Sequence, residues 1–395
     1  MSMPELSPPP MLLLRGGEVF APEPMGQADL LLAGGRLVAM GPLASPPADW
    51  PVSVIELHGK RVIPGLVDSH VHLAGGGGEA GAATRVRPVE LSHLTRAGVT
   101  TAIGLLGTDV TTRSIAELLA NARGLAELGL TALCYAGGYA VPPATITGSV
   151  RGDLTHVDRL VAVGEVAISD HRSSQPTFDE IARLAADCHV AGLMTGKAGL
   201  LHQHLGDGPR GLELVRRCLD ETELPPRTFH PTHCNRNRRL WEEAKALSKR
   251  GIYVDITAFP ADDEGLTATA AISDWLDSGL DPARLTCSSD GGGCLPVFGP
   301  DGRVAHMDVG RSSSLCETLA ELVAAGRSLA QVLPMMTSNV SQLFRLSGKG
   351  VLTPGADADL VVLDERGRPW HVLAGGRWML RDGEAQLLGL FEPRG

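Results

Sequence analysis

The stretch "PGLVDSHVHLAGGGGEAG", residues 64–81, joins an apolar run to two histidines, four consecutive glycines and a glutamate. Such a run is consistent with a buried β-strand. Side chains two residues apart in a strand point to the same side, so His70 and His72 project together, as two ligands of one metal ion must. A His-x-His pair alone is weak support for a metal site, and its meaning depends on the residues at the ends of the other strands.

Eight runs of this kind occur along the chain, and each is followed by a stretch long enough for a loop and a helix. They are VIPGLVDSHVHL (62–73), VTTAIGLLGTD (99–109), LTALCYAGGY (130–139), VGEVAIS (163–169), GLLHQHLGD (199–207), RTFHPTHCN (227–235), IYVDITAF (252–259) and LTCSSDGGG (285–293). Between the second and third runs, apolar residues recur at helical spacing over residues 115–125, which predicts an amphipathic helix. The alternation predicts an α/β fold.

Two α/β architectures fit this alternation: a (β/α)8 TIM-like barrel over residues 61–349, or an open doubly wound sheet. Polar residues collect at the C-terminal ends of the runs, which favours the barrel, because such barrels place their active sites on that face. The flanking segments 11–41 and 350–383 show short β-type runs broken by Gly, Pro and Asp. We therefore expect residues 1–60 and 350–395 to form one small β-sandwich domain.

Composition excludes several classes of protein. The formal net charge of -10 argues against nucleic-acid binding, which needs clustered Lys and Arg. The seven cysteines are scattered and odd in number, so they do not indicate a secreted disulfide framework and fit a reducing cytoplasm. No stretch approaches the ~18 consecutive apolar residues of a membrane span. We expect a soluble, cytoplasmic protein that binds neither membrane nor nucleic acid.

Further metal ligands occur in later runs. His202 and His204 lie in the fifth run, His230 and His233 in the sixth, and Asp290 in the eighth. The spacing alone does not decide which histidine of each pair faces the mouth of the barrel. One histidine from each pair, together with the first two histidines and Asp290, would give four imidazoles and a carboxylate, which is enough for two metal ions.

These residues and motifs resemble the amidohydrolase superfamily, and within it the isoaspartyl (β-aspartyl) dipeptidases. The motifs that carry the narrower resemblance are HVHLAGGGGEAG, GLLGTD, TITGSV, AISDHRS, THCNRN and SSDGGG, and the match covers nearly the whole chain. The resemblance implies a binuclear zinc metallopeptidase, with two Zn²⁺ per chain, that hydrolyses the isopeptide bond of β-aspartyl dipeptides. It also selects His204 and His233 from the two ambiguous pairs, through HLGD and THCNR.

The resemblance assigns a role to each matching residue. The implied metal ligands are His70, His72, Glu165, His204, His233 and Asp290. The implied substrate-binding residues are Glu79 for the α-ammonium group, Thr108, Tyr139, Arg172, Arg236 and Cys294. In the implied mechanism a hydroxide that bridges the metal ions attacks the carbonyl, Asp290 shuttles the proton, and Tyr139 polarises the carbonyl.

Two positions depart from the family pattern. Glu165 stands where the family typically has a carboxylated lysine that bridges the metal ions, and its side chain is several bonds shorter. We expect Glu165 to bridge; the alternatives are an effectively mononuclear site or a carboxylated Lys197. Cys294 stands where the family usually has a serine that contacts a substrate carboxylate, and a thiol is a weaker donor.

Two other functions are compatible with the sequence. One is another amidohydrolase reaction, such as that of an N-acyl amino acid deacylase or a cyclic amidase, which would use the same metal ions but not Glu79, Arg172 and Arg236 as a set. The other is a non-catalytic relative, which an intact set of ligands disfavours. We expect the partner to be a small-molecule dipeptide, and the protein to form a homo-oligomer.

Overall fold

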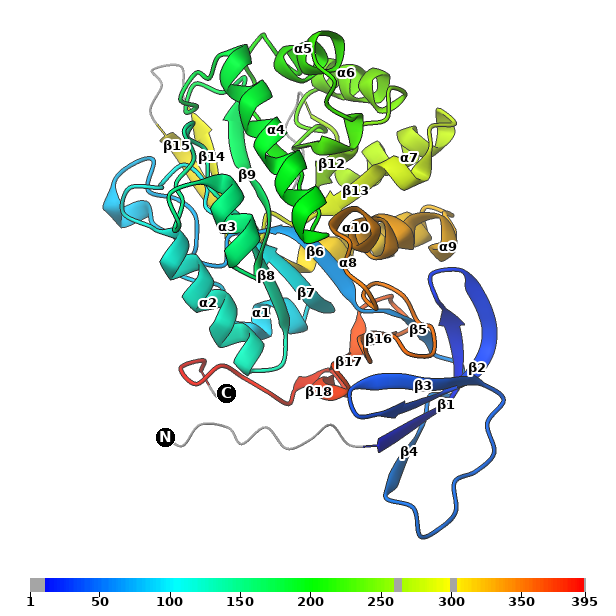
Figure 1. Ribbon diagram of the computed structural model, residues 1–395. Coiled ribbons are helices and arrows are strands. Elements are labelled where there is room, and N and C mark those ends of the chain that lie inside the picture. Colours follow the sequence, from blue (N-terminus) through cyan, green and yellow to red (C-terminus); the bar gives the residue numbers. More distant parts are fainter. Residues whose placement is uncertain (1–10, 259–264, 299–303, 394–395) are drawn as a thin grey trace.

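The computed structural model describes residues 11–258, 265–298 and 304–393. Figure 1 shows an α/β body in which strands and helices alternate, and below it a β-sheet built from both ends of the chain. Residues 1–10 of the predicted small domain lie outside the described residues, as does Phe259, the last residue of the seventh predicted run.

The sheet from the chain ends has nine strands, in the order β19-β18-β17-β16-β5-β1-β2-β3, with β4 also paired to β1. They are β1 (Met11–Phe20), β2 (Pro24–Ala33), β3 (Arg36–Gly41), β4 (Val52–Glu56), β5 (Arg61–Pro64), β16 (Leu360–Leu363), β17 (Pro369–Ala374), β18 (Arg377–Arg381) and β19 (Glu384–Ala385). The two ends meet at the antiparallel pair β5–β16, where Val62 lies opposite Val362. The strands form one continuous sheet, where we had expected the two sheets of a sandwich, and it extends past residue 60 to Pro64.

Eight strands of the α/β body overlap the eight predicted runs. They are β6 (Leu66–Val71), β7 (Val99–Gly104), β8 (Thr131–Ala136), β9 (Leu160–Ile168), β10 (Leu201–Leu205), β11 (Phe229–Thr232), β12 (Val254–Thr257) and β13 (Leu285–Ser288). The first six form a curled parallel sheet in the order β11-β10-β9-β8-β7-β6, and β12 pairs in parallel with β13. The body is therefore a TIM-barrel-like α/β structure.

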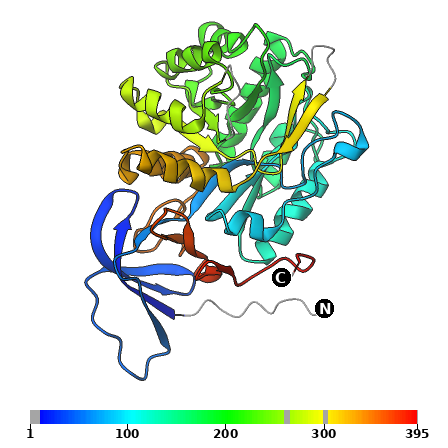
Figure 2. The same cartoon turned by 180° about the vertical axis from the view of Figure 1, so that it is seen from behind.

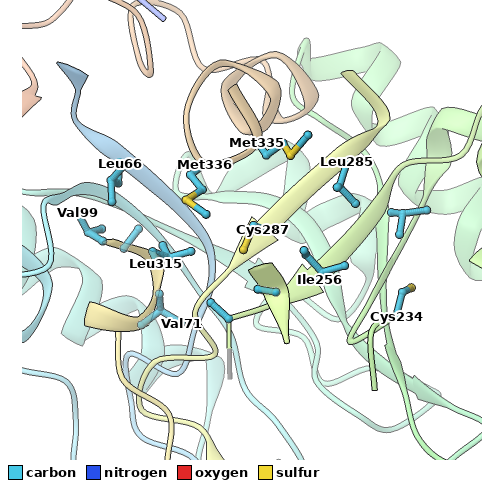
Figure 3. Packing of buried hydrophobic residues seen from close by; sticks show 14 of the residues in the cluster. Leu66, Val71, Val99, Cys234, Ile256, Leu285, Cys287, Leu315, Met335 and Met336 are labelled. Atoms are coloured by element: carbon cyan, nitrogen blue, oxygen red, sulfur yellow. The ribbon is translucent and has the colours of Figure 1, made fainter. Parts of the chain in front are cut away.

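Backbone hydrogen bonds connect the two sheets of the body on both sides. The Cys234 N–H donates to the Asp255 carbonyl at 3.2 Å, and the His72 N–H donates to the Gly291 carbonyl at 2.8 Å. Figure 3 shows Leu66 on β6, Cys287 on β13 and other apolar side chains gathered in the buried core beside these strands. The ends of β6, β11, β12 and β13 are thus brought to one side of the body.

Helices cover the outside of the body, as the two opposite views in Figures 1 and 2 show. They are α1 (Leu91–Thr95), α2 (Ile115–Glu127), α3 (Val150–His156), α4 (Phe178–Thr195), α5 (Glu213–Glu221), α6 (Arg238–Ser248), α7 (Ala268–Asp277), α8 (Ser313–Ala324), α9 (Leu329–Val332) and α10 (Ser338–Phe344), with short 3-10 turns η1 (Ala82–Thr84), η2 (Pro226–Thr228), η3 (Pro282–Arg284) and η4 (Leu333–Met336). The predicted helix over 115–125 is α2, which Ser114 caps by accepting from the Glu117 N–H. Among the described helices none is long and apolar enough to cross a membrane.

The glycine-rich segment after β6 is held in place by its surroundings. Gly75 has a positive φ of 76°, and a Cβ there would overlap the carbonyl oxygen of Val86. The buried Arg113 guanidinium, just before α2, donates to the carbonyl of Ala74, and at 2.9 Å to each of the carbonyls of Gly76 and Val86. On the other side, the segment contacts the residues that lead into the hairpin of β14 (Cys294–Phe298) and β15 (Val304–Val309), through the Gly76 N–H and the Gly292 carbonyl.

Replacing Arg113 by Leu is expected to loosen this segment, because three carbonyls lose their donor. Hydrogen–deuterium exchange of residues 74–89 should become faster, while exchange in the barrel strands stays as in the parent protein. Arg123→Leu, at an exposed position of α2, is the control and should leave exchange unchanged both in residues 74–89 and in the barrel strands. Unchanged exchange over 74–89 in Arg113→Leu would contradict this account of the segment.

Candidate active site

A cavity of about 800 Å³ opens where the strands of the body end. Its lining includes His72, Glu79, Thr108, Tyr139, Glu165, Arg172, His204, His233, Arg236, Asp290 and Cys294. His70, which is completely buried, contacts two of these residues from beneath. The structure therefore brings together all the site residues predicted from the sequence, although they come from distant parts of the chain.

The Glu165 carboxylate, on β9, lies at the centre of the predicted ligands and is buried. Its Oε1 is 3.5 Å from His72 Nε2. Its Oε2 is 3.1 Å from His204 Nδ1, 3.5 Å from His233 Nε2 and 3.6 Å from His70 Nε2. One carboxylate thus contacts four imidazoles, and its two oxygens face different histidines.

The Asp290 carboxylate contacts His70 and His72 as well. Its Oδ1 is 3.0 Å from His72 Nε2 and 3.5 Å from His70 Nε2. Asp290 and His233 both have left-handed backbone conformations, with φ of 52° and 59°. Such conformations are uncommon for residues other than glycine, and they cluster at functional sites where the surrounding structure enforces them.

The two ambiguous histidine pairs separate clearly in space. His204 and His233 line the cavity beside Glu165. His202 and His230 lie deeper: His202 Nε2 is 2.9 Å from His70 Nδ1, and its Nδ1 is 3.0 Å from His230 Nδ1. They therefore lie behind the site.

Lys197, the alternative bridging residue, lies elsewhere. Its ammonium group donates to the backbone carbonyls of Leu154 and Val157, at 2.7 and 2.8 Å. Lys197 is absent from the cavity lining among the described residues. A carboxylated lysine at this position would not reach the predicted ligands without breaking these bonds.

Asp170 is a site residue that sequence reasoning missed. Its Oδ2 accepts from His204 Nε2 at 2.9 Å and from the Arg172 guanidinium at 2.8 Å. The Tyr139 hydroxyl lies on the other side of the same imidazole, 2.8 Å from His204 Nδ1. The sequence signal for Asp170 was its place in the motif AISDHRS, two residues before Arg172, whereas its contact with His204 arises from the fold.

The donor atoms suit a metal centre. In each of three sets the ligand atoms lie within 4.8 Å of one another: His70, His233 and Asp290; His70, His72 and Glu165; and Glu165, His204 and His233. His70 Nε2, His72 Nδ1 and Asp290 Oδ1 are buried and have no hydrogen-bond partner. Buried polar atoms without partners are rare in native proteins, and nitrogen and carboxylate donors in this mixture suit zinc. The residues present therefore fit a metal ion, and three overlapping sets offer room for more than one.

Burial decides the protonation state of two cavity groups. It raises the pKa of Tyr139 well above its ordinary value, and the nearby Glu165 acts in the same direction, so the phenol keeps its proton and can donate it. Burial also raises the pKa of the Cys294 thiol to about 12, again with help from a carboxylate, that of Glu79. At neutral pH both groups are therefore neutral donors.

Charged groups lie around the rest of the cavity. Glu79 Oε1 accepts from the Thr108 hydroxyl at 3.2 Å and is 3.8 Å from the Arg172 guanidinium, while the buried Oε2 has no hydrogen-bond partner. The Arg236 guanidinium is 3.5 Å from an Asp207 carboxylate oxygen. One carboxylate with a free oxygen and two guanidinium groups thus share a cavity with the cluster around Glu165.

Comparisons with known proteins show which family the chain resembles. A family model for the amidohydrolase family matches residues 61–379. The chain is similar to a solved β-aspartyl dipeptidase from the thermophilic keratin degrader Fervidobacterium islandicum AW-1, in complex with the dipeptide β-Asp-Leu, at 37% identity and a TM-score of 0.93, covering 98% of this chain and 100% of that one.

More distant relatives share the fold or the length of the chain. A solved D-hydantoinase from Thermus sp. is 17% identical, with a TM-score of 0.68 and coverage of 95% and 96%, which supports the fold alone. The dihydroorotase of Pelotomaculum thermopropionicum is 24% identical over 442 residues, covering 94% of this chain and 99% of that protein. Because the family model matches most of the chain and the first solved relative matches it almost throughout, this protein belongs to the amidohydrolase family and, within it, to the group of the β-aspartyl dipeptidases.

Proposed function

We propose that this amidohydrolase cleaves the isopeptide bond of β-aspartyl dipeptides. The observation that carries the proposal is the unpartnered Glu79 oxygen, which shares one cavity with Arg172, Arg236 and the cluster around Glu165. A β-aspartyl dipeptide has a free α-ammonium group to pair with a carboxylate, and two free carboxylates to pair with guanidinium groups. The dipeptide held by the Fervidobacterium relative supports the same substrate class.

In the proposed metal centre, Glu165 would be shared by two zinc ions. His70 and His72 would hold one ion, His204 and His233 would hold the other, and Asp290 would complete the set. Bound zinc would lower the pKa of a water molecule to about 7 and would polarise the scissile carbonyl. The position of the Glu165 carboxylate within 3.6 Å of all four imidazoles supports this bridging role.

Asp290 and Tyr139 supply the proton transfer and the hydrogen bond. Asp290 Oδ1 lies at the cavity beside His72 and His70, and these neighbours lower the pKa of the carboxyl, so it is ionised and could take the proton that the attacking water loses. The same carboxyl then gives this proton to the amine nitrogen as the C–N bond breaks. The Tyr139 hydroxyl donates to the carbonyl oxygen as negative charge develops on it.

A cyclic amidase is the second candidate, because the curated relatives at 24–25% identity are named dihydroorotase. Such a reaction would use the same metal centre, and a cyclic amide has no free α-ammonium group. The buried, unpartnered oxygen of Glu79 would then have no function, which favours the dipeptidase. An N-acyl amino acid deacylase meets the same objection.

The proposal includes the architecture expected from the sequence. In it the eight strands β6 to β13 close into a complete (β/α)8 barrel, and the nine-stranded sheet from the two chain ends forms a small domain of its own. The backbone hydrogen bonds from Cys234 to Asp255 and from His72 to Gly291 support the closure. The cytoplasmic location and the homo-oligomeric state stay predictions.

Metal analysis tests the centre. After equilibrium dialysis against excess Zn²⁺, elemental mass spectrometry should find two zinc ions per chain. Glu165→Ala should hold at most one, because both ions lose a shared ligand. Glu79→Gln, which changes a carboxylate of the same cavity outside the cluster, is the matched control and should hold two. One ion in the parent protein would contradict a bridging Glu165.

Asp290→Asn tests the proton shuttle. The amide keeps the shape of the carboxylate but cannot accept the proton, and general acid–base catalysis is worth about 10²–10⁴-fold. We expect kcat to fall by at least that factor. Zinc content measured on the same sample separates loss of the base from loss of a ligand. A variant that keeps most of the parent kcat would rule out this role for Asp290.

A substrate panel tests the specificity. The parent protein should cleave β-Asp-Leu, and it should leave α-Asp-Leu and N-acetyl-β-Asp-Leu intact. Glu79→Gln should lose most of its kcat/KM for β-Asp-Leu, because the ammonium group loses its charged partner. Hydrolysis of the acetylated compound at the rate of the free one would exclude the Glu79 role, and ring opening of dihydroorotate would support the cyclic amidase instead.

A further inference from the structure

A continuous line of buried polar side chains runs from His70 into the interior of the barrel. His70 Nδ1 is 2.9 Å from His202 Nε2, and His202 Nδ1 is 2.9 Å from the His230 carbonyl oxygen and 3.0 Å from His230 Nδ1. His230 Nε2 is 2.9 Å from the Thr286 hydroxyl, which donates to Asp255 Oδ1 at 2.5 Å. All five side chains are buried, and they come from five different strands, β6, β10, β11, β13 and β12.

The network ends at the Asp255 carboxylate, which accepts hydrogen bonds from three hydroxyl groups. Besides Thr286, the hydroxyls of Thr232 and Ser288 donate to Asp255 Oδ2, at 2.7 and 2.6 Å. An ionised carboxylate can only accept hydrogen bonds, so the direction of every bond in the network is set from this end. We call His202, His230, Thr286 and Asp255 the buried network.

The direction of these bonds assigns one tautomer to each imidazole. The Thr286 hydroxyl gives its proton to Asp255 and must accept from His230 Nε2–H. His230 Nδ1 and the His230 carbonyl are then the acceptors for His202 Nδ1–H. That leaves His202 Nε2 as the acceptor for His70 Nδ1–H.

The neutral form of His70, which is the form that can bind a metal ion, therefore has its proton on Nδ1 and its lone pair on Nε2. This atom has no hydrogen-bond partner, and it lies 3.5 Å from Asp290 and 3.6 Å from Glu165. A neutral imidazole with a free Nε2 is the form that binds zinc. The tautomer set from within the barrel is therefore the one that the metal centre needs.

The surrounding residues also prevent the rings from turning. The Tyr135 ring stacks on His202, with centroids 5.0 Å apart and an angle of 16°, and its hydroxyl donates to the Ser69 carbonyl. The Phe344 ring meets His230 edge-on at 5.9 Å. A Cβ on Gly164 would come within 2.7 Å of the His202 Cβ, so β9 can pass here only because residue 164 is glycine.

We propose that the buried network consists of positioning residues that hold His70 in its metal-binding tautomer and orientation, and thereby raise the affinity of the centre for zinc. This inference rests on the proposed metal centre. Groups that orient a metal-bound histidine in this way are typically worth about 10–100-fold in metal affinity. The network does not touch the substrate cavity among the described residues, so its effect should appear in metal binding and not in KM.

The test measures the Zn²⁺ dissociation constants by competition with a chelator, together with the melting temperature of the metal-free protein. His202→Leu removes the acceptor and should weaken zinc binding by about 10–100-fold. His202→Gln, whose side-chain oxygen can accept from His70, should recover most of that loss. Gln203→Leu is the matched control: this neighbour on β10 is equally buried, its amide has no hydrogen-bond partner among the described residues, and zinc affinity should stay unchanged.

A second pair covers the case in which His202→Leu does not fold. Thr286→Val keeps the shape of the side chain and interrupts the network two hydrogen bonds away from His202, so zinc should bind more weakly, whereas Thr286→Ser should bind it normally. A lower melting temperature of metal-free His202→Leu or Thr286→Val, together with an unchanged zinc affinity, would overturn the inference and leave the proposed metal centre intact. If the parent protein itself binds no zinc, the proposed function and this inference both fall.

Discussion

The site depends on one ionic contact, the Glu165 carboxylate buried among four imidazoles. A charged group taken out of water costs several kcal/mol unless partners compensate it. Burial alone would raise the pKa of Glu165, but the surrounding imidazoles, His70 first among them, hold this pKa well below its ordinary value. In the proposed centre two cations supply that compensation, which explains why the strands bring so many ligands to one point.

Local sequence patterns predicted much of this arrangement. The two-residue period of a strand placed His70 and His72 on one side, and polar strand ends predicted that Asp290 would join them. The patterns did not indicate how deep along the barrel axis each side chain lies. His202 and His204 lie on the same face of β10, yet only His204 reaches the cavity, because a step of two residues along the strand moves a side chain from one layer of the barrel interior to the next.

Contacts between segments far apart in the sequence could not be predicted, because local patterns do not say which segments the fold brings together. Arg113 fixes the glycine segment through carbonyls 27 to 39 residues away, and nothing local marks this arginine as different from others. Asp170 meets His204 across 34 residues. The chain ends were predicted as a β-rich unit from turn residues, whereas their union into one sheet through β5 and β16 depends on strand pairing that no short motif encodes.

Relatives with this scaffold are named β-aspartyl dipeptidase, dihydroorotase and D-hydantoinase, so the fold alone does not decide the substrate. The central claim concerns the proposed metal centre around Glu165. Its most direct test is a crystal structure of the zinc-loaded protein, with anomalous diffraction measured on both sides of the zinc absorption edge. We expect two zinc peaks, one beside His70 and His72 and one beside His204 and His233, with the Glu165 carboxylate between them. A single peak, or two peaks that Glu165 does not join, would contradict that claim.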